Sequence, residues 1–481
     1  MKTLSEFDSS RLEAAVREKG LSAEHILAPT GSGTELDAAL RFVRRFGDRL
    51  RYCQTFGWHA WDGRCWAPEA EPEARRLSME AARLWTAEAT RYDGEGREDR
   101  IKAALRLESC AAIDHVVSLA KTLPPIQTKH TAFDADAWLL NVENGTLNLR
   151  TGTLRPHNAA DLITKVAPVH FGPDATDEWF DLFLNSLREG DPELPGFLQR
   201  AFGMSLTADV SSDKLFLVSS DGGSSKTTAT ESFAEMLGAY AVKMDFSSFC
   251  QSRHGRSPGS ATADLVTLRG ARFAYATEGD ENARLDAGRV KELTGSERIA
   301  VRPLYRPQTT LSPTWKLWLV SNFDPKADAD DTGVWRRMLK VSFPVVPEGK
   351  RDPRVKEQLR TAASARAAML AWSVRGCLEW QRGGGGSVGL KVPAAVAAET
   401  DAYREKSDVL GEWWDLLIEE GRLHTNGWTP TKDLRQHYEK WCEENGFNPV
   451  GGRRWNDYLR RRGLTPRAGN GGTRGWAGLT L

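Results

Sequence analysis

One stretch of the sequence, residues 215 to 238, combines residue types whose spacing suits phosphate chemistry. The letters LFLVSSDGGSSKTTATESFAEMLG run from apolar residues through small ones to Lys226 and Thr227, and then into a helical pattern. A triphosphate needs converging backbone N–H groups, a helix N-terminus, one lysine and a hydroxyl for Mg²⁺. The P-loop pattern asks for glycine where this chain has Ser220 and Ser225. Alone, the stretch fits a nucleotide site and an ordinary strand–turn–helix connection equally well.

The other small residues of this turn keep the nucleotide interpretation open. Gly222 and Gly223 can adopt unusual backbone angles. A serine at position 225 is workable if that position has a negative φ at the helix start, because its side chain is small. The candidate phosphate-binding residues are therefore Gly222, Gly223, Ser224, Ser225, Lys226 and Thr227.

Three later stretches add polar groups at strand ends. ARFAYATEGDEN is an apolar strand that ends at Glu278, where a carboxylate can hold Mg²⁺ and polarise the attacking water. TWKLWLVSNF ends at Asn322, whose amide can orient that water, and DTGVWRRMLKVSF brings Arg336 and Arg337, a residue type suited to a neighbour's γ-phosphate. Each stretch alone also fits a cap, a turn or a surface ion pair. Their order along the chain favours the nucleotide site.

The segment 205–345 resembles the superfamily 3 helicase core of the phage and plasmid primase–helicase family, a branch of the AAA+ ring ATPases. The stretches that carry the resemblance are SSDGGSSKTT, FAYATEGDENARLD, VKELTGSERIAVRPLY, WKLWLVSN and DTGVWRRM. LLNVENGTLNLRTGTLRPHNAADLITKVAPVHF resembles the family's segment ahead of the motor, and YREKSDVLGEWW with LRQHYEKWCEENG resembles its C-terminal domain. The resemblance thus covers roughly residues 40 to 481.

This resemblance implies a role for each matching residue. Lys226 would bind the β- and γ-phosphates, Thr227 and Glu278 would hold Mg²⁺, Asn322 would be sensor 1, and Arg336 or Arg337 would act on the neighbouring subunit's ATP. The family's hairpin that enters the ring's pore corresponds to GSERIAVRPLYRPQ, whose candidate DNA-binding residues are Arg298, Arg302 and Arg306. The implied cofactors are ATP and Mg²⁺, and the implied assembly is a homo-hexamer. The two serines depart from the pattern and put ATP affinity and turnover in doubt.

The C-terminal region predicts three helices, at 407–421, 429–446 and 451–463, followed by a hairpin with an N-G-G turn. Three helices and a hairpin are the parts of a winged helix, whose third helix enters a DNA groove. The third helix and the hairpin are strongly basic, which fits either DNA binding or a solvated, ring-stabilising face. The candidate DNA ligands are Arg453, Arg454, Arg460, Arg461, Arg462, Arg467 and Arg474.

The predicted fold class is α/β: a P-loop AAA+ motor core with a mixed α+β N-terminal domain and a C-terminal winged helix. Alternating apolar and polar residues at 138–157 predict a β-meander, and 56–66 predicts a hairpin with Asp62-Gly63 at its turn. The predicted domains are 1–200, 201–382 for the ATPase with a helical tail, a flexible Gly-rich linker at 383–400, and 401–481.

Composition excludes several classes of protein. The 481 residues carry no net formal charge, so DNA contact must come from local basic patches. The longest apolar runs are too short to cross a bilayer. The six cysteines are scattered, which predicts reduced thiols and a location in the cytoplasm. If a phage encodes the chain, this would be the cytoplasm of the bacterial host. Asp134 and Asp136 form a D-x-D that we interpret as a structural turn. Primer synthesis is therefore not supported, and a separate primase becomes an expected partner.

Two hypotheses follow from the sequence. The first is an ATP-dependent DNA helicase of phage or mobile-element replication, which acts as a ring and translocates on single-stranded DNA. The alternative is a non-hydrolysing origin DNA-binding protein that uses the winged helix and keeps a degenerate P-loop as a scaffold. Ser220 and Ser225 motivate the alternative.

Overall fold

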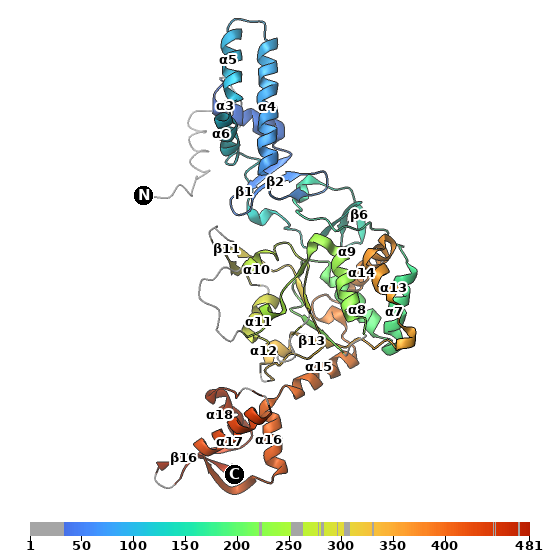
Figure 1. The fold of residues 1–481 in the computed structure, drawn as a ribbon, viewed down its shortest axis with the longest axis vertical. Coiled ribbons are helices and arrows are strands. Elements are labelled where there is room, and N and C mark those ends of the chain that lie inside the picture. Colours follow the sequence, from blue (N-terminus) through green and yellow to red (C-terminus); the bar gives the residue numbers. More distant parts are fainter. Residues whose placement is uncertain are drawn as a thin grey trace.

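The computed structural model describes residues 33–220, 224–251, 263–277, 279, 283–295, 297–302, 308–329, 331–445, 447, 449–469 and 472–481. Three bodies succeed one another along its long axis, and we define them as the N-terminal body (33–136), the central body (137–408) and the C-terminal body (409–481) (Figure 1). Among the helices in these ranges, none combines the length and the apolar character that a membrane span requires.

The N-terminal body packs four helices against a small antiparallel sheet with the order β1-β2-β3. Thr34 and Ser109 start two of the helices by accepting backbone N–H bonds on their hydroxyls. The predicted Asp-Gly turn is confirmed, because Gly63 has a φ of +96° and Asp62 accepts from the N–H groups of Arg64 and Cys65. The elements are α3 (Glu35–Phe46), β1 (Leu50–Cys53), β2 (Gly57–Trp61), β3 (Trp66–Ala67), α4 (Glu71–Arg91), α5 (Arg97–Leu107) and α6 (Cys110–Ala120).

The predicted β-meander is confirmed as a three-stranded sheet of β4 (Leu139–Val142), β5 (Gly145–Asn148) and β6 (Thr153–Arg155). Its buried side chains share one continuous core with α7 (Glu178–Gly190), α8 (Leu194–Ser205) and the large sheet that follows. The predicted domain boundary at residue 200 therefore lies inside α8 and within this shared core.

The central body contains a five-stranded sheet with the order β13-β7-β12-β9-β8, in which every neighbouring pair is parallel. This confirms the predicted open α/β sheet. Side chains alternate between its two faces: Phe216 and Val218 belong to one core, whereas Leu215 and Leu217 belong to the other. The strands are β7 (Leu215–Ser219), β8 (Ala241–Lys243), β9 (Phe273–Thr277), β12 (Lys316–Ser321) and β13 (Met338–Val341).

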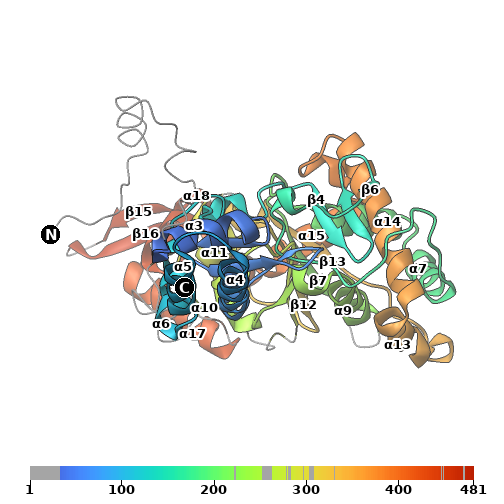
Figure 2. The same ribbon diagram turned by 90° about the horizontal axis from the view of Figure 1, so that it is seen from above.

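Helices cover both faces of this sheet (Figure 1). One face packs against α8, α9 (Lys226–Leu237) and α14 (Ala363–Arg382), and the other packs against α10 (Ala263–Val266), α11 (Ala287–Thr294) and α12 (Thr332–Trp335). At the far end of the first face, α13 (Pro353–Thr361) lies beside α7 and α14 (Figures 1 and 2). A short hairpin of β10 (Ile299–Val301) and β11 (Thr309–Leu311) stands next to the second face.

The Gly-rich stretch after α14 differs from the flexible linker that its composition predicts. Residues 384 to 386 are glycines at positive φ, which lets the chain turn back onto Trp380. The N–H of Gly385 donates to the Trp380 carbonyl at 3.0 Å, and the Trp380 indole donates to the Gly386 carbonyl at 2.8 Å. Residues 394 to 400 are helical, because α15 (Ala394–Lys406) packs along β13. The predicted linker therefore includes helical residues at 394 to 400, and the glycines ahead of them are hydrogen-bonded to Trp380.

The C-terminal body has the three predicted helices and the predicted hairpin. They are α16 (Val409–Glu419), α17 (Thr431–Glu444), α18 (Gly452–Arg461), β15 (Thr465–Ala468) and β16 (Arg474–Leu479). An additional strand, β14 (Leu423–Pro430), pairs with β16, with a shift in register between Leu423 and Trp428. Four buried aromatic side chains form the centre of its core: Trp413, Tyr438, Trp455 and Trp476.

Candidate nucleotide and nucleic-acid sites

The carboxyl ends of three neighbouring strands meet at one edge of the central sheet. Ser219, the last residue of β7, pairs with Ser321, the last residue of β12, and Val320 pairs with Thr277, the last residue of β9. Ser219, Thr277 and the exposed Asn322 therefore all lie at this edge. Glu278 itself lies outside the described residues.

Within the turn between β7 and α9, the described residues hold one another. The Lys226 ammonium is buried and donates to the Ser220 carbonyl at 2.7 Å, while the hydroxyls of Ser220 and Ser224 share a hydrogen bond of 2.5 Å. The backbone of Ser224 also bridges to Val345. Gly222 and Gly223 lie outside the described residues. One of the two serines that replace glycine thus fastens the turn through its side chain.

Ser225 has the negative φ at the helix start that a serine requires at this position. It stands at the N-cap of α9 with a φ of −78°, so serine adopts this conformation without strain. Its side chain makes no capping hydrogen bond to the helix. The half-buried Thr227 sits in the first turn, where helix N–H groups favour an anion.

Two residues that sequence reasoning missed stand at the same edge. Asp324 follows Asn322 by two positions and accepts a hydrogen bond of 2.6 Å from the Ser219 hydroxyl. Lys340, from β13, forms an ion pair with the other oxygen of Asp324. The position of Asp324 just after a strand end was a usable signal, whereas nothing in the sequence connects it to Lys340.

The two candidate arginines lie at the opposite edge of the sheet. Met338, which follows them, pairs with Leu215 at the start of β7, and the four residue steps to Ser219 span about 13 Å. The Arg336 side chain is 65% exposed and lies 3.8 Å from Asp213. The Arg337 side chain is only 11% exposed and donates to the Gly333 carbonyl at 2.8 Å. The two adjacent arginines therefore have different surroundings.

Asp213 and Lys214 hold the segment that carries these arginines. Asp213 is within 4 Å of both guanidinium groups, at 3.8 Å from Arg336 and 3.7 Å from Arg337. The Lys214 ammonium donates to the Arg336 carbonyl. Burial is the main reason that the pKa of Lys214 is lowered, and the positive charges of the two arginines lower it further.

The candidate pore hairpin is present as β10 and β11, which pair between Ile299–Leu311 and Val301–Thr309. Its base is anchored because those apolar side chains join the core on the second face of the sheet. Arg298 and Arg302 flank β10 and are exposed. Arg306 lies outside the described residues.

Some of the candidate arginines of the C-terminal body pair with side chains of the same chain. Arg454 forms an ion pair with Asp328, in the loop that follows β12, Arg460 pairs with Asp457 at 3.1 Å, and Arg462 donates to the Tyr458 hydroxyl at 3.0 Å. Arg454 is partly buried. The other six candidates are exposed on α18, at its end and on the β15–β16 hairpin: Arg453, Arg460, Arg461, Arg462, Arg467 and Arg474.

The D-x-D pair is structural, as the sequence predicts. Asp134 accepts hydrogen bonds from the Thr164 N–H at 2.8 Å and from the Thr164 hydroxyl at 2.6 Å. Asp136 accepts from the Trp138 N–H at 2.9 Å. These carboxylates therefore fix the chain where the N-terminal body joins the meander.

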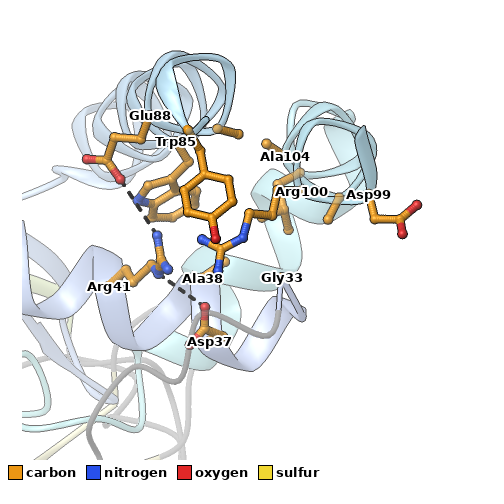
Figure 3. Close-up of a pocket in the computed structure, with 13 residues that line it drawn as sticks. Gly33, Asp37, Ala38, Arg41, Trp85, Glu88, Asp99, Arg100 and Ala104 are labelled. Carbon is orange, nitrogen blue, oxygen red and sulfur yellow. Dashed lines mark ion pairs between the residues drawn. The ribbon is translucent and has the colours of Figure 1, made fainter. Parts of the chain in front are cut away.

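A pocket in the N-terminal body lies between α3, α4 and α5, far along the chain from the sites above (Figure 3). Arg41 points across it and pairs with Asp37 at 3.1 Å and with Glu88 at 3.7 Å. Arg100 lies over the ring of Tyr92 at 4.0 Å. The two arginines of the pocket wall are thus both engaged by neighbouring side chains of the same body.

Comparison with known proteins finds a family match in the first half of the chain. Residues 39–189 match the family described as D5 N terminal like, and this range covers most of the N-terminal body, the meander and most of α7.

Several viral proteins are similar over longer stretches. A candidate helicase of Acanthamoeba polyphaga mimivirus is 23% identical over 402 residues, which is 76% of this chain and 40% of that protein. A candidate primase of African swine fever virus (isolate Warthog/Namibia/Wart80/1980) is 27% identical over 296 residues, 58% of this chain and 30% of that protein. A candidate helicase of Frog virus 3 is 28% identical over 249 residues, 48% of this chain and 25% of that protein. The matches thus span less than half the length of each of these relatives.

Among solved structures, the apo C-terminal region of NrS-1 is similar, with a TM-score of 0.43 and 12% sequence identity. The similarity covers 75% of this chain and 89% of that chain.

Proposed function

We propose, on the premise that this chain belongs to the phage and viral primase–helicase family, that it is an ATP-dependent DNA helicase of phage or mobile-element replication. The observation that carries the proposal is the shared edge of β7, β9 and β12. Parallel strands bring their carboxyl ends together, and ligands bind α/β sheets at that edge. The residues proposed to bind ATP follow the strands that end at this edge: Lys226 comes after β7, Glu278 after β9 and Asn322 after β12.

ATP and Mg²⁺ fit the residues at this edge. The first turn of α9 takes no side-chain cap from Ser225, so its N–H groups suit phosphate oxygens. The Lys226 ammonium already rests on a carbonyl oxygen of the loop and would exchange it for the β- and γ-phosphates. Thr227 and Glu278 would hold the metal ion, whose charge would offset that developing on the γ-phosphate. Asn322 would orient the attacking water.

The two candidate arginines lie away from the nucleotide site of their own chain. Arg336 and Arg337 stand at the opposite edge of the sheet, so only an adjacent copy could present one of them to the γ-phosphate. Arg336 suits this role better, because its side chain is 65% exposed, whereas that of Arg337 is 11% exposed. Repeating this contact closes a ring, for which we propose a homo-hexamer.

DNA contact is proposed for two places. The hairpin of β10 and β11 would carry Arg298, Arg302 and Arg306 against one strand in the ring's pore. The C-terminal body would act as a winged helix, with α18 in a groove of duplex DNA and the β15–β16 hairpin on its backbone. Primer synthesis is not part of the proposal, and a separate primase would supply it.

ATP turnover tests this function. We expect hydrolysis that requires Mg²⁺ and rises with single-stranded DNA. Lys226→Ala should abolish it, and the thermal midpoint of this variant shows whether it is folded under the assay conditions. Asn322→Ala should lower kcat strongly and change the KM for ATP less, because the Asn322 amide acts on the attacking water. Hydrolysis no faster than background by the unmutated chain, with DNA and Mg²⁺ present, would refute the proposal.

A second candidate is a non-hydrolysing origin-binding protein. The hydrogen bonds of the phosphate turn favour it, because Lys226 donates to the Ser220 carbonyl and the hydroxyls of Ser220 and Ser224 bond to each other. Binding of a fluorescent ATP analogue separates the two candidates. If the chain fails to bind the analogue and still binds duplex DNA through the arginines of α18, the second candidate is correct.

A further inference from the structure

We propose that Asp324 is a positioning residue of the nucleotide site: it fixes the end of β7, and with it the phosphate loop, against the segment that carries Asn322. This inference rests on the proposed ATPase function. Asp324 would not touch the nucleotide. It would set the distance between the two groups that do.

The position of Asp324 at the end of the β-ladder is the first reason. The pairing of β7 with β12 ends at Ser219 and Ser321, and beyond this pair the two chains separate into loops. The Ser219 hydroxyl donates to Asp324 Oδ1 at 2.6 Å, across this point of separation. Ser219 is 3% exposed, so solvent does not compete for its hydroxyl. The bond therefore extends the connection between the strands past the last backbone pair.

The next residue links this bond to the phosphate loop. Ser220 follows Ser219, and its carbonyl accepts from Lys226 at 2.7 Å. Asn322 precedes Asp324 by two positions, on the chain that leaves β12. A displacement of about 1 Å between catalytic groups can cost about 100-fold in rate. The Ser219–Asp324 bond is placed to prevent such a displacement.

The charge of Asp324 needs compensation, because a free carboxylate at this edge would repel a triphosphate. Lys340 supplies it from β13, with a side chain that is only 16% exposed and an ammonium paired with Asp324. The Lys340 N–H donates to Thr400 of α15 at 2.9 Å, which holds that part of β13 in place. Asp324 thus joins β7, β12 and β13 without adding net charge to the site.

The helix α15 supports the same segment from the other side. The Tyr403 hydroxyl donates to the Pro325 carbonyl, directly after Asp324. Tyr403 is 3% exposed, and burial, aided by the charge of Asp324, raises the pKa of its hydroxyl, so the proton stays in place. The Lys340 ammonium lies 5.4 Å from the centre of the Tyr403 ring. The segment after Asn322 is therefore held by contacts from three elements.

Kinetics of the full chain tests the proposal. We expect Asp324→Ala and Ser219→Ala to lower kcat about 10- to 100-fold, with the KM for ATP changed less than about threefold, because misplaced catalytic groups act on the transition state. Asp324→Asn, which keeps an oxygen acceptor for Ser219, should lose less than Asp324→Ala. The double variant should lose no more than the worse single variant, because one bond joins the two side chains.

Thr164→Val is the matched control. It removes a hydroxyl-to-carboxylate hydrogen bond of the same 2.6 Å length, from Thr164 to Asp134, away from the nucleotide edge. Its kcat should equal that of the unmutated chain. The thermal midpoint of each variant shows whether it is folded under the assay conditions. If Asp324→Ala unfolds, the kinetics of Ser219→Ala test the proposal.

The outcomes separate this inference from the proposed function. If the unmutated chain hydrolyses ATP and the folded Asp324→Ala and Ser219→Ala variants keep its kcat, the positioning role is wrong and the ATPase function stands. Additive losses in the double variant would also overturn it. An unmutated chain without ATPase activity would overturn the proposed function, and this inference with it.

Discussion

The adjacent arginines of the central body allow a matched pair of substitutions. Arg336 is exposed at the sheet edge, where its contact with Asp213 at 3.8 Å is a surface ion pair. Such a pair contributes about 0 to 1 kcal/mol, so Arg336→Ala should leave the free energy of unfolding nearly unchanged. If Arg336 reaches a neighbour's γ-phosphate, the same substitution should lower kcat about 1,000-fold or more.

Arg337→Ala should show the opposite pattern. The Arg337 guanidinium is 11% exposed and donates to the Gly333 carbonyl at 2.8 Å, so its removal leaves this partly buried acceptor without its donor. A hydrogen bond to a charged group contributes about 1.5 to 3 kcal/mol, and the free energy of unfolding should fall by about that amount. The folded fraction should keep a kcat near that of the unmutated chain.

The assay is ATP hydrolysis with single-stranded DNA and Mg²⁺, together with chemical denaturation of each variant. Mixed rings then test whether the arginine acts between subunits. Neither the Lys226→Ala chain nor the Arg336→Ala chain should hydrolyse ATP when it is assayed alone. In rings formed from an equal mixture of the two, an intact lysine faces an intact arginine at about a quarter of the interfaces, and activity should return there. Full turnover by Arg336→Ala, or a mixture that regains no activity, would show that Arg336 does not act on the neighbouring subunit's ATP.

Three further predictions concern other parts of the chain. Asp328→Asn removes the carboxylate that pairs with Arg454, so the affinity for duplex DNA should rise about two- to fivefold. Fluorescence anisotropy measures this affinity, and a decrease would contradict the proposed role of α18. Arg302→Ala should reduce the slope of log K against log salt for single-stranded DNA by about 1, and an unchanged slope would exclude a phosphate contact. Burial, with the charge of Arg269, lowers the pKa of His59 from 6.5 to about 4. The contribution of His59 to stability is therefore present above pH 6.5 and is lost as the pH falls toward 4. In urea titrations, the free energy of unfolding should fall by about 2 kcal/mol from this cause between pH 7.5 and 5, and the His59→Gln variant should not show this decrease.

Local patterns in the sequence predicted much of the fold. The Asp-Gly pair at 62 and 63, the meander and the three C-terminal helices depend on turn residues and periodicity, which act over a few positions. The strand β14 was missed because its pairing with β16 shifts register between Leu423 and Trp428, which breaks the expected alternation.

Contacts between distant segments could not be predicted in this way. Glycines at 384 to 386 indicate flexibility by composition, yet Trp380 supplies a surface and a donor that hold the turn. Arg454 has the residue type of a DNA ligand, and only the docking of the C-terminal body brings it to Asp328. The pairing of Asp324 with Lys340 depends on the strand order, since β7 lies between β12 and β13.

The most direct test of the nucleotide site is a structure of the assembled chain with a non-hydrolysable ATP analogue, Mg²⁺ and single-stranded DNA. We expect the Lys226 ammonium to leave the Ser220 carbonyl for the β- and γ-phosphates, with Asn322 facing the γ-phosphate and Arg336 of the adjacent copy reaching it. An analogue bound away from this edge, with Lys226 still on the Ser220 carbonyl, would contradict this expectation.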